Sequence, residues 1–477
     1  MAPHTFLWHD YETFGVQPRR ARPSQFAAIR TDAELKEIGE PIMLYCQPAP
    51  DFLPDPQSCL ITGITPQVCL ERGVPEHQFA ATIEQAFAAS GTIGVGYNTI
   101  RFDDEITRFL FWRNLIDPYA REWQNNCGRW DILDMVRTAY ALRPEGIKWP
   151  HHEDGRPSFK LEHLSRENGL THESAHDALS DVRATIALAR LVRNHQPKLF
   201  DFCLALHKKD RVNEEIGLPK RRPLLHVTGM VPAERGCIAL VLPMAIHPGN
   251  KNEVIVWDLA HDPAQLDGLD ADTIRLRMFS KADALPEGVT RLPIKTIHVN
   301  KSPIVISNLK ILSAEMAQRW QIDLATALRH AEAAATQPLP DVLWQQVFQR
   351  TAEEPVDVDE DLYGGFIGNN DRRLLMQLRT MTPAKIAAPN IHFDDARLEE
   401  LVFRYRARNF PDTLNEIDAK RWEQHRAARL FDGAAGARSI ERLFDEIDQL
   451  SETVDERGEA ILGALYDYAE TIAPARN

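Results

Sequence analysis

Two carboxylates lie close together near the start of the chain, directly after a short apolar segment. The segment Phe6–Trp8 is expected to start a β-strand that continues through Asp10 and Glu12. Because the side chains of a strand alternate between its two faces, both carboxylates point the same way. Two such charges repel each other, and a bound cation would relieve the repulsion. Taken alone, however, an Asp-x-Glu pair is more often a solvated strand end than a metal site.

A second acidic group follows the strand candidate Gly91–Tyr97. Asp103 and Asp104 open the segment Asp103–Asn114, which is expected to be a helix. An aspartate at a helix start is commonly an N-cap, whose side chain accepts hydrogen bonds from exposed backbone N–H groups. The two residues cannot both be the cap, which leaves one carboxylate for another role.

The third acidic group surrounds the start of the predicted helix Asp177–Arg193. Asp177 is a good N-cap for this helix, and His176 lies just before it. Asp181 lies about one turn inside the helix. A histidine at a helix start is more often a surface or core residue than a catalyst, so this group does not identify a reaction by itself.

Together, these residues resemble the DEDD superfamily of 3′→5′ exonucleases. Asp10, Glu12 and Asp103 are followed by a His-x4-Asp motif, His176 to Asp181, as in the DEDDh branch. Carboxylate oxygens suit Mg²⁺ and Mn²⁺, and a pair of such ions would clamp the attacking and leaving oxygens of a phosphodiester. The resemblance implies that the four carboxylates are metal ligands and that His176 is the general base. An imidazole with a pKa of about 6.5 suits that role.

Longer segments throughout the chain are similar to the bacterial exodeoxyribonuclease I family. In the first part of the chain they are His9–Gly15, Arg22–Asp32, Leu60–Gln67, Arg101–Glu105, Tyr140–Ile147 and Leu161–Leu164. Toward the C-terminus they are His226–Met230, Leu362–Phe366 and Tyr405–Pro411. The similarity implies processive 3′→5′ hydrolysis of single-stranded DNA to 5′-mononucleotides, in DNA repair and recombination. It also implies two Mg²⁺ ions, for which Mn²⁺ can substitute.

The predicted elements indicate an α/β fold class. In the first part of the chain, strand candidates such as Phe26–Arg30 and Ile42–Cys46 are followed by helical segments such as Gln78–Ala89 and Trp130–Leu142. This order is typical of a mixed sheet flanked by helices. Short strand candidates separated by Pro and Gly follow from about residue 196, and amphipathic helices follow the acidic segment Glu353–Asp361.

The resemblance assigns these parts to three domains. It implies an RNase H-like mixed-sheet nuclease domain at 1–195, an SH3-like β domain at 196–350 and a C-terminal helical domain at 351–477. The acidic segment Glu353–Asp361 is expected to be a linker between the last two domains. The resemblance also implies that the protein is a monomer.

Single-strand binding needs a basic channel and aromatic faces on which bases stack. Near the carboxylates, the candidates for substrate contacts are Phe14, Asn98 and Phe102, together with Glu12 itself. Each aromatic ring could equally belong to the core, and we favour Phe14 because it directly follows the Asp-x-Glu strand. Farther along, Lys160 stands where the family is expected to have a phosphate-contacting arginine. Lysine keeps the charge but loses bidentate geometry.

Basic residues later in the chain are candidates for binding the DNA backbone or a protein partner. Lys208, Lys209 and Lys220–Arg222 could track phosphates, although a solvated surface is the more common explanation for such a run. For Arg404–Arg408, structural ion pairing and partner binding are equally supported. The resemblance implies that the acidic C-terminal tail of single-strand-binding protein docks on a basic groove, for which these arginines are candidates.

The composition is that of an ordinary globular enzyme. The 477-residue chain is 44% hydrophobic and 26% charged and contains no apolar run long enough to span a bilayer. Met1–Leu7 lacks the pattern of a secretory signal, and the six cysteines lack the spacing of a zinc site. We therefore expect a cytoplasmic protein. The net charge of −14 disfavours phosphate binding by the surface as a whole, but local basic runs leave the partner open.

Two other functions are compatible with the same carboxylates. The first is a DEDDh exoribonuclease or a polymerase-type proofreader, although such a domain would not account for the family-like segments after about residue 195. The second is a catalytically inactive nuclease fold that serves as a single-strand-binding scaffold. The presence of all four carboxylates and of His176 argues against it.

Overall fold

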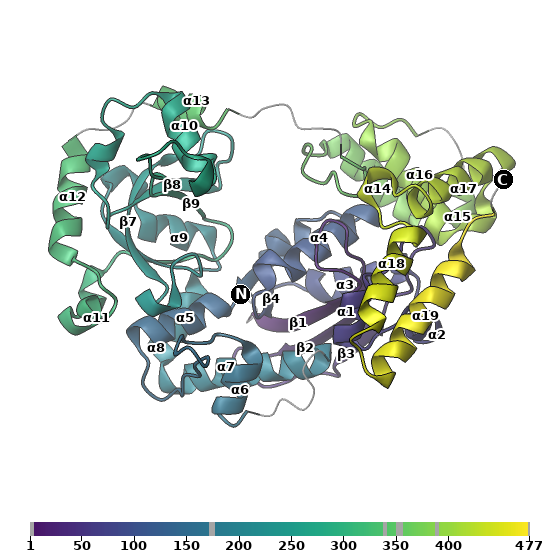
Figure 1. Cartoon of the computed structure of the whole chain (residues 1–477), viewed down its shortest axis with the longest axis horizontal. Helices are drawn as coiled ribbons and strands as arrows, with labels where there is room; N and C mark the ends of the chain where they lie inside the picture. The colour runs from purple at the N-terminus through teal and green to yellow at the C-terminus, as the bar shows by residue number, and fades with distance from the viewer. Residues whose placement is uncertain (1–3, 171–176, 337–340, 350–355, 387–390, 476–477) are drawn as a thin grey trace. The chain divides into compact units, whose positions relative to one another are not determined.

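The computed structural model describes residues 4–170, 177–336, 341–349, 356–386 and 391–475 (Figure 1). The chain forms two compact units. The first unit contains Met1–Gly128, His172–Arg183 and Glu354–Asn477, and the second contains Arg129–Thr171 and Ala184–Glu353.

The sheet of the first unit contains strands in the order β3-β2-β1-β4. Their bounds are β1 Thr5–Thr13, β2 Pro23–Thr31, β3 Ile42–Tyr45 and β4 Thr92–Gly96. β1 pairs antiparallel with β2 and parallel with β4, so the sheet is mixed. In this register Asp10 lies opposite Ala27 and Glu12 lies opposite Gln25. The pairing register shifts between Glu12 and Thr13, at the end of β1.

Helices from the N-terminal part of the chain lie beside this sheet: α1 Pro56–Thr62, α2 Pro66–Arg72, α3 Glu76–Ala88 and α4 Asp103–Arg113. α1 and α2 each begin with a proline after a side-chain N-cap, Asp55 and Thr65 respectively. Proline suits the first helical position because its missing N–H would have no partner there. The sheet packs on α3 and α4 through a buried core that includes Tyr11, Phe79 and Leu110.

Helices from the C-terminal part of the chain complete the first unit: α14 Asn369–Thr380, α15 Pro383–Ile386, α16 Arg397–Asn409, α17 Glu416–Leu430, α18 Ile440–Ser451 and α19 Glu456–Ile472. α18 and α19 run side by side (Figure 1) and pack on α1 and α2 through a core that joins Cys59 to Leu465. α14 and α16 pack on α4 through a core that joins Trp112 to Leu375 and Leu398. The C-terminal helices therefore share apolar cores with the strands and helices at the N-terminus.

The second unit has its own antiparallel sheet, in the order β10-β6-β7-β8-β9. Its strands are β6 Leu224–Val227, β7 Ile238–Ile246, β8 Glu253–Asp258, β9 Ile294–His298 and β10 Ile304–Ile306, and β5 Gly128–Asp131 begins at the boundary between the units. Its helices are α5 Leu133–Leu142, α6 Leu161–Glu167, α8 Pro197–Ala205, α9 Lys209–Ile216, α10 Ala271–Phe279, α11 Ala314–Arg319, α12 Leu324–Thr336 and α13 Asp341–Val347. Helix α7 Ala178–His195 begins in the first unit and ends in the second.

Some of these elements differ from the sequence prediction. The sequence predicts a helix from Trp130, but Trp130 lies in β5, and the side chain of Asp131 accepts a hydrogen bond from the N–H of Leu133, where α5 begins. α1 and α2 were not predicted, because seven residues are too few for a helical period to be visible in the sequence. Within the described ranges, every helix is too short or too polar to cross a lipid bilayer.

Candidate active site

Three carboxylates from two elements converge in the first unit. β1 carries Asp10 and Glu12, and the first turn of α7 carries Asp181. One ligand oxygen from each of the three side chains lies within 4.8 Å of those of the other two. This spacing allows a single divalent cation to contact all three carboxylates.

Asp103 joins this group from the start of α4. Its Oδ1 accepts a hydrogen bond at 3.1 Å from the backbone N–H of Tyr11, the residue between the two β1 carboxylates. The sequence expectation that one of Asp103 and Asp104 caps α4 is wrong, because Phe102 occupies the N-cap position and no side chain caps it. Asp104 instead pairs with Arg121 at 2.5 Å, and both side chains are buried. We call Asp10, Glu12, Asp103 and Asp181 the carboxylate site.

Asp177 is the N-cap of α7, as the sequence predicts. Its Oδ2 accepts a hydrogen bond at 3.1 Å from the N–H of Ser180. Asp177 also acts electrostatically on the carboxylate site, since its charge contributes to the raised pKa values of Asp10 and Glu12. Sequence reasoning missed this second effect, although the position of Asp177 four residues before Asp181 could have indicated it.

The pKa values of the carboxylate site record an excess of negative charge. Burial, followed by repulsion from Asp103 and Glu12, raises the pKa of Asp10 well above its ordinary value. Burial, followed by repulsion from Asp181 and Asp103, raises the pKa of Glu12 to about 8. A divalent cation would reverse both effects, because it favours the ionised form of each ligand. The all-oxygen donor set fits a hard cation such as Mg²⁺ or Mn²⁺.

The predicted general base, His176, lies outside the described residues, two positions before the start of α7. The remaining candidates for substrate contacts lie in different environments. Asn98 is exposed, with a left-handed backbone φ of 63° at the end of the loop after β4. Phe102 is half-buried and packs against the core of the sheet. Lys160 is exposed at the N-cap of α6, in the second unit.

The structure does not support the stacking role expected for Phe14. Its side chain is 1% exposed and belongs to the core that joins α1 and α2 to the C-terminal helices. A ring with so little exposed surface offers too small a face for a base to stack on, so we propose no such role for it. The alternative that the sequence left open, a core residue, describes its position.

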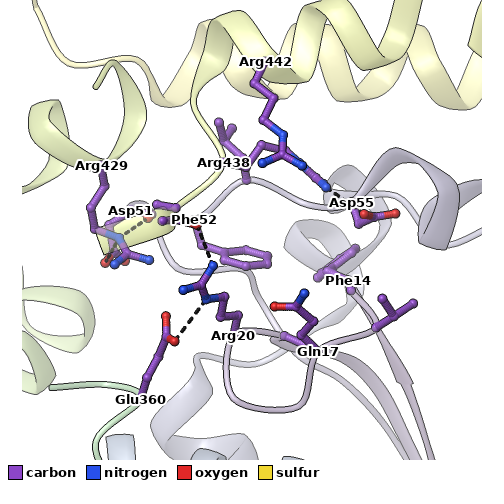
Figure 2. A pocket seen from close by; sticks show the side chains of 16 residues that line it. Phe14, Gln17, Arg20, Asp51, Phe52, Asp55, Glu360, Arg429, Arg438 and Arg442 are labelled. Carbon is purple, nitrogen blue, oxygen red and sulfur yellow. Dashed lines mark hydrogen bonds and ion pairs between the residues drawn. The ribbon is translucent and has the colours of Figure 1, made fainter. Parts of the chain in front are cut away.

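A cavity of about 240 Å³ lies beyond the end of β1 (Figure 2). It is lined by Phe14 and Phe52 and by several arginines, among them Arg20 and Arg438. These arginines already have carboxylate partners: Arg20 pairs with Glu360 at 3.0 Å, and Arg438 pairs with the Asp55 that caps α1 at 2.7 Å. The positive charges of the cavity therefore hold the C-terminal part of the chain to two N-terminal loops, the loop between β1 and β2 and the loop between β3 and α1.

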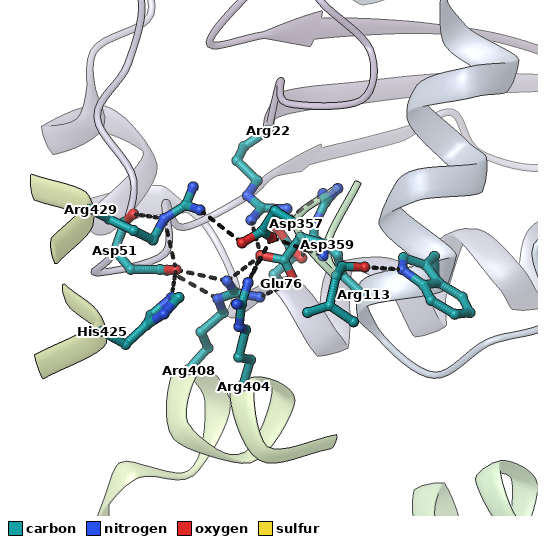
Figure 3. Close-up of polar contacts among 12 residues, drawn as sticks. Arg22, Asp51, Glu76, Arg113, Asp357, Asp359, Arg404, Arg408, His425 and Arg429 are labelled. Carbon is teal, nitrogen blue, oxygen red and sulfur yellow. Dashed lines mark hydrogen bonds and ion pairs between the residues drawn. The ribbon is translucent and has the colours of Figure 1, made fainter. Parts of the chain in front are cut away.

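Arg404 and Arg408, two of the arginines considered for partner binding, have side chains that are almost wholly covered and that form ion pairs (Figure 3). Arg408 donates to Asp51 at 2.7 Å and to Asp359 at 3.0 Å. Arg404 donates to Asp357 at 2.7 Å. Arg406, also on α16, pairs with Asp418. Of the two explanations that the sequence left open for Arg404–Arg408, the structure shows structural ion pairing.

The predicted acidic linker takes part in the same ion pairs. Asp357 and Asp359 belong to it, and Asp359 is buried between Arg408 and Arg22, the residue directly before β2. The interpretation of this part of the segment as a linker is therefore wrong. The physical reason is that its carboxylates neutralise arginines from both ends of the chain. We call Arg22, Asp51, Asp357, Asp359, Arg404, Arg408 and Arg429 the charge cluster.

Comparison with known families assigns all three parts of the chain. Residues 7–189 match the family described as Exonuclease, residues 207–350 match the Exonuclease I SH3-like domain, and residues 356–472 match the Exonuclease I C-terminal domain. These matches, with the mixed sheet of the first unit and the antiparallel sheet of the second, confirm the expected fold class. It comprises a mixed-sheet α/β nuclease domain, an SH3-like β domain and a C-terminal helical domain.

Individual relatives match over nearly the whole length. Exodeoxyribonuclease I of Escherichia coli (strain K12) is 44% identical over 475 residues, which cover 98% of each chain. The structure of an exonuclease I from Methylocaldum szegediense superposes with a TM-score of 0.93 at 46% identity, covering 98% of this chain and 99% of that one. A zinc-bound complex of E. coli exonuclease I with single-stranded DNA gives a TM-score of 0.91 at 42% identity, covering 98% and 99%. The chain is therefore an exonuclease and belongs to the bacterial exodeoxyribonuclease I family.

Proposed function

We propose that this protein removes nucleotides processively from the 3′ end of single-stranded DNA and releases 5′-mononucleotides. The observation that carries the proposal is the convergence of Asp10, Glu12 and Asp181, with Asp103 beside them, at the end of one strand. Phosphodiester hydrolysis needs a water activated near neutral pH and stabilisation of a leaving oxygen. A partly buried group of carboxylates would supply both through the divalent cations that it would hold.

Relatives support the substrate class and the need for a metal. The E. coli exonuclease I structure cited above contains single-stranded DNA and a zinc ion. In this chain the oxygen-only donor set favours Mg²⁺, with Mn²⁺ as a substitute, over zinc, which usually takes nitrogen or sulfur ligands. Two ions held by the four carboxylates would supply the activated water and stabilise the leaving oxygen.

The protein's own residues position these groups. β1 fixes Asp10 and Glu12, and α7 and α4 bring Asp181 and Asp103 to the same place. We assign His176 as the general base that takes a proton from the attacking water, since an imidazole changes charge near neutral pH. The raised pKa of Glu12 indicates a site whose carboxylates are fully ionised only when cations are bound.

Contacts with the rest of the strand are part of the same proposal. Lys160 is assigned to a phosphate, while Asn98 and Phe102, which lie close to Asp103 along the chain, are assigned to the terminal nucleotide together with Glu12. The domain boundaries at 195 and 350 and the monomeric state also belong to this proposal. A cytoplasmic role in DNA repair and recombination belongs to it as well. We also propose that the tail of single-strand-binding protein docks on this protein. Arg404–Arg408 are no longer candidates for that docking site, because the arginines among them are engaged in ion pairs.

The test is to supply equal amounts of 3′-labelled and 5′-labelled single-stranded DNA with Mg²⁺. Immediate release of labelled mononucleotide from the 3′-labelled strand alone is expected. Early release from the 5′-labelled strand would contradict the polarity. Faster loss of an RNA oligomer of equal length would favour an exoribonuclease instead.

The matched variants are Asp10→Asn and Asp445→Asn. Asp445 is exposed on α18 and does not belong to the carboxylate site, so its variant should release label at the wild-type rate. Asp10→Asn should release almost none. Equal rates for the two variants would show that the carboxylate site is not the place of hydrolysis.

A further inference from the structure

Gln25 is a buried amide beside the carboxylate site that the proposed chemistry does not use. It lies in β2, is 2% exposed and faces Glu12 directly across the antiparallel pair. Residues opposite each other in such a pair project from the same face of the sheet. The side chain of Gln25 therefore lies on the face that carries Glu12 and Asp10.

The same face receives the start of α7. The first backbone N–H groups of a helix have no partner within the helix, and a buried N–H without an acceptor is costly. The Asp177 side chain accepts from one of them, the N–H of Ser180. The N–H of the fully buried Ala178, the first residue of α7, donates to Oε1 of Gln25 at 3.4 Å. The first turn of α7 is thus capped both by its own aspartate and by a side chain from the sheet.

We propose that Gln25 is a positioning residue that fixes the first turn of α7, and with it Asp181, against the carboxylates of β1. Asp181 is the fourth residue of α7, so a displacement of Ala178 moves its carboxylate by a similar amount. The ligand oxygens of Asp10, Glu12 and Asp181 lie within 4.8 Å of each other only while strand and helix keep this register. This inference rests on the proposed function, because it assumes that the carboxylate site binds divalent cations.

The amide is suited to this position for two reasons. It is neutral, so it adds no charge beside carboxylates whose pKa values are already raised by mutual repulsion. It is also long enough to reach from β2 to the helix, whereas asparagine is one methylene shorter. A methionine would fill the same space but would leave the Ala178 N–H buried without this acceptor.

The experiment titrates Mn²⁺ into the metal-free wild type and into the Gln25→Met and Gln25→Asn variants by calorimetry. The matched control is Gln67→Met, which removes a different, partly buried amide. Gln67 donates to the carbonyl of Ala464 and does not belong to the carboxylate site. Groups that orient metal ligands typically contribute about 10- to 100-fold to metal affinity, and we expect a loss of this size in both Gln25 variants. The control should bind Mn²⁺ as the wild type does.

Activity and stability separate positioning from a general loss of structure. Excess Mn²⁺ should restore kcat of Gln25→Met to near the wild-type value with an unchanged KM for DNA. The metal-free Gln25→Met variant should still unfold in one cooperative transition, with a melting temperature lowered only by the loss of the acceptor for the Ala178 N–H. If Gln25→Met does not fold, Gln25→Asn decides the question.

Wild-type Mn²⁺ affinity in the Gln25 variants would overturn the inference, as would a loss of kcat that excess metal does not restore. A wild type that binds no Mn²⁺ would instead defeat the proposed function on which the inference rests.

Discussion

The first unit contains two groups of buried or half-buried aspartates whose electrostatic environments are opposite. At the carboxylate site, burial and neighbouring carboxylates raise the pKa of Asp10. In the charge cluster, burial alone would raise the pKa of Asp51, but Arg408, His425 and Arg429 lower it well below its ordinary value. The pKa of Asp359 is lowered in the same way by Arg408 and Arg22.

The difference shows what an aspartate is used for in this fold. Where arginines from the C-terminal helices neutralise the carboxylates, the ion pairs hold the two ends of the chain together (Figure 3). Where several carboxylates face one another instead, the folded protein keeps an unfavourable charge that a cation from solution can relieve. The first arrangement stabilises the fold. In the second, relief of the repulsion between the carboxylates would add to the free energy of metal binding.

The largest expected effect is on activity at the carboxylate site. Replacing Asp10 with asparagine removes a proposed metal ligand and should lower kcat by about 10³-fold or more, because metal catalysis supplies both the nucleophile and the stabilisation of the leaving oxygen. The metal-free variant should be at least as stable as the wild type, since one repelling charge is gone. Nucleotide release and the melting temperature measure the two effects. If Asp10→Asn released nucleotides at the wild-type rate, or lost both activity and stability, the contrast between the carboxylate site and the charge cluster would be wrong.

In the charge cluster the same substitution should act on stability. Asp359→Asn leaves Arg22 and Arg408 buried without a full counter-charge, which should lower the free energy of unfolding by about 4–5 kcal/mol. The matched control is Asp154→Asn, in an exposed pair with Arg156, where no measurable change is expected. Denaturant unfolding followed by circular dichroism provides the measurement. Equal losses of stability in the two variants would contradict the stabilising role that we assign to the charge cluster.

Adjacent aspartates at the start of α4 give a sharper comparison. Asp104 belongs with the aspartates of the charge cluster in kind, because it forms an ion pair with the buried Arg121. Asp104→Asn should therefore lower the free energy of unfolding by about 3 kcal/mol. Asp103→Asn keeps the oxygen that accepts from Tyr11 and should leave metal-free stability unchanged or higher, while Mn²⁺ affinity falls. If the two variants change stability in the same direction, the division into two classes is wrong.

The two regions should also respond oppositely to pH. In the metal-free folded protein the pKa of Glu12 is about 8, above its ordinary value of 4.5. The folded state therefore holds a proton that the unfolded chain has released, and its stability falls as pH rises from about 4.5 to about 8. Bound cations require the ionised form, so Mn²⁺ should raise the melting temperature more at pH 8.5 than at pH 6.

In the charge cluster, stability should change with pH in the opposite direction. Because the pKa values of Asp51 and Asp359 are lowered, their stabilisation is fully present above the ordinary aspartate pKa and is lost as pH falls through the lowered values. Melting curves of the metal-free protein from pH 3 to pH 9 measure both trends. A metal-induced shift that is larger at pH 6 than at pH 8.5 would contradict the assignment of Glu12.

Parts of the carboxylate site follow from local geometry in the sequence, but their convergence was predicted only from the resemblance to the DEDD exonucleases. The alternation of a strand places Asp10 and Glu12 on one face, and the cap of a helix places Asp181 one turn inside it. Asp103 was harder to place, since its approach to β1 depends on the parallel pairing of β1 with β4. Gln25 was missed because its role follows from an antiparallel register and a helix start far away in the chain.

The charge cluster could not be predicted for a different reason. Arg408 and Asp359 look like surface residues in the sequence, and only the packing of α16 on the start of the chain buries them together. The same holds for Phe14, whose burial depends on α18 and α19 at the opposite end of the sequence. Pairings between distant segments carry no periodic signal, so a single sequence does not show them.

The most direct test of the central claim is a calorimetric titration of the metal-free protein with Mn²⁺ at pH 8.5, followed by the same titration of an Asp10→Asn, Glu12→Gln double variant. We predict saturable binding by the wild type with release of protons, and no comparable binding by the variant. Equal binding by the two proteins, or none by the wild type, would show that these carboxylates do not hold the catalytic metal.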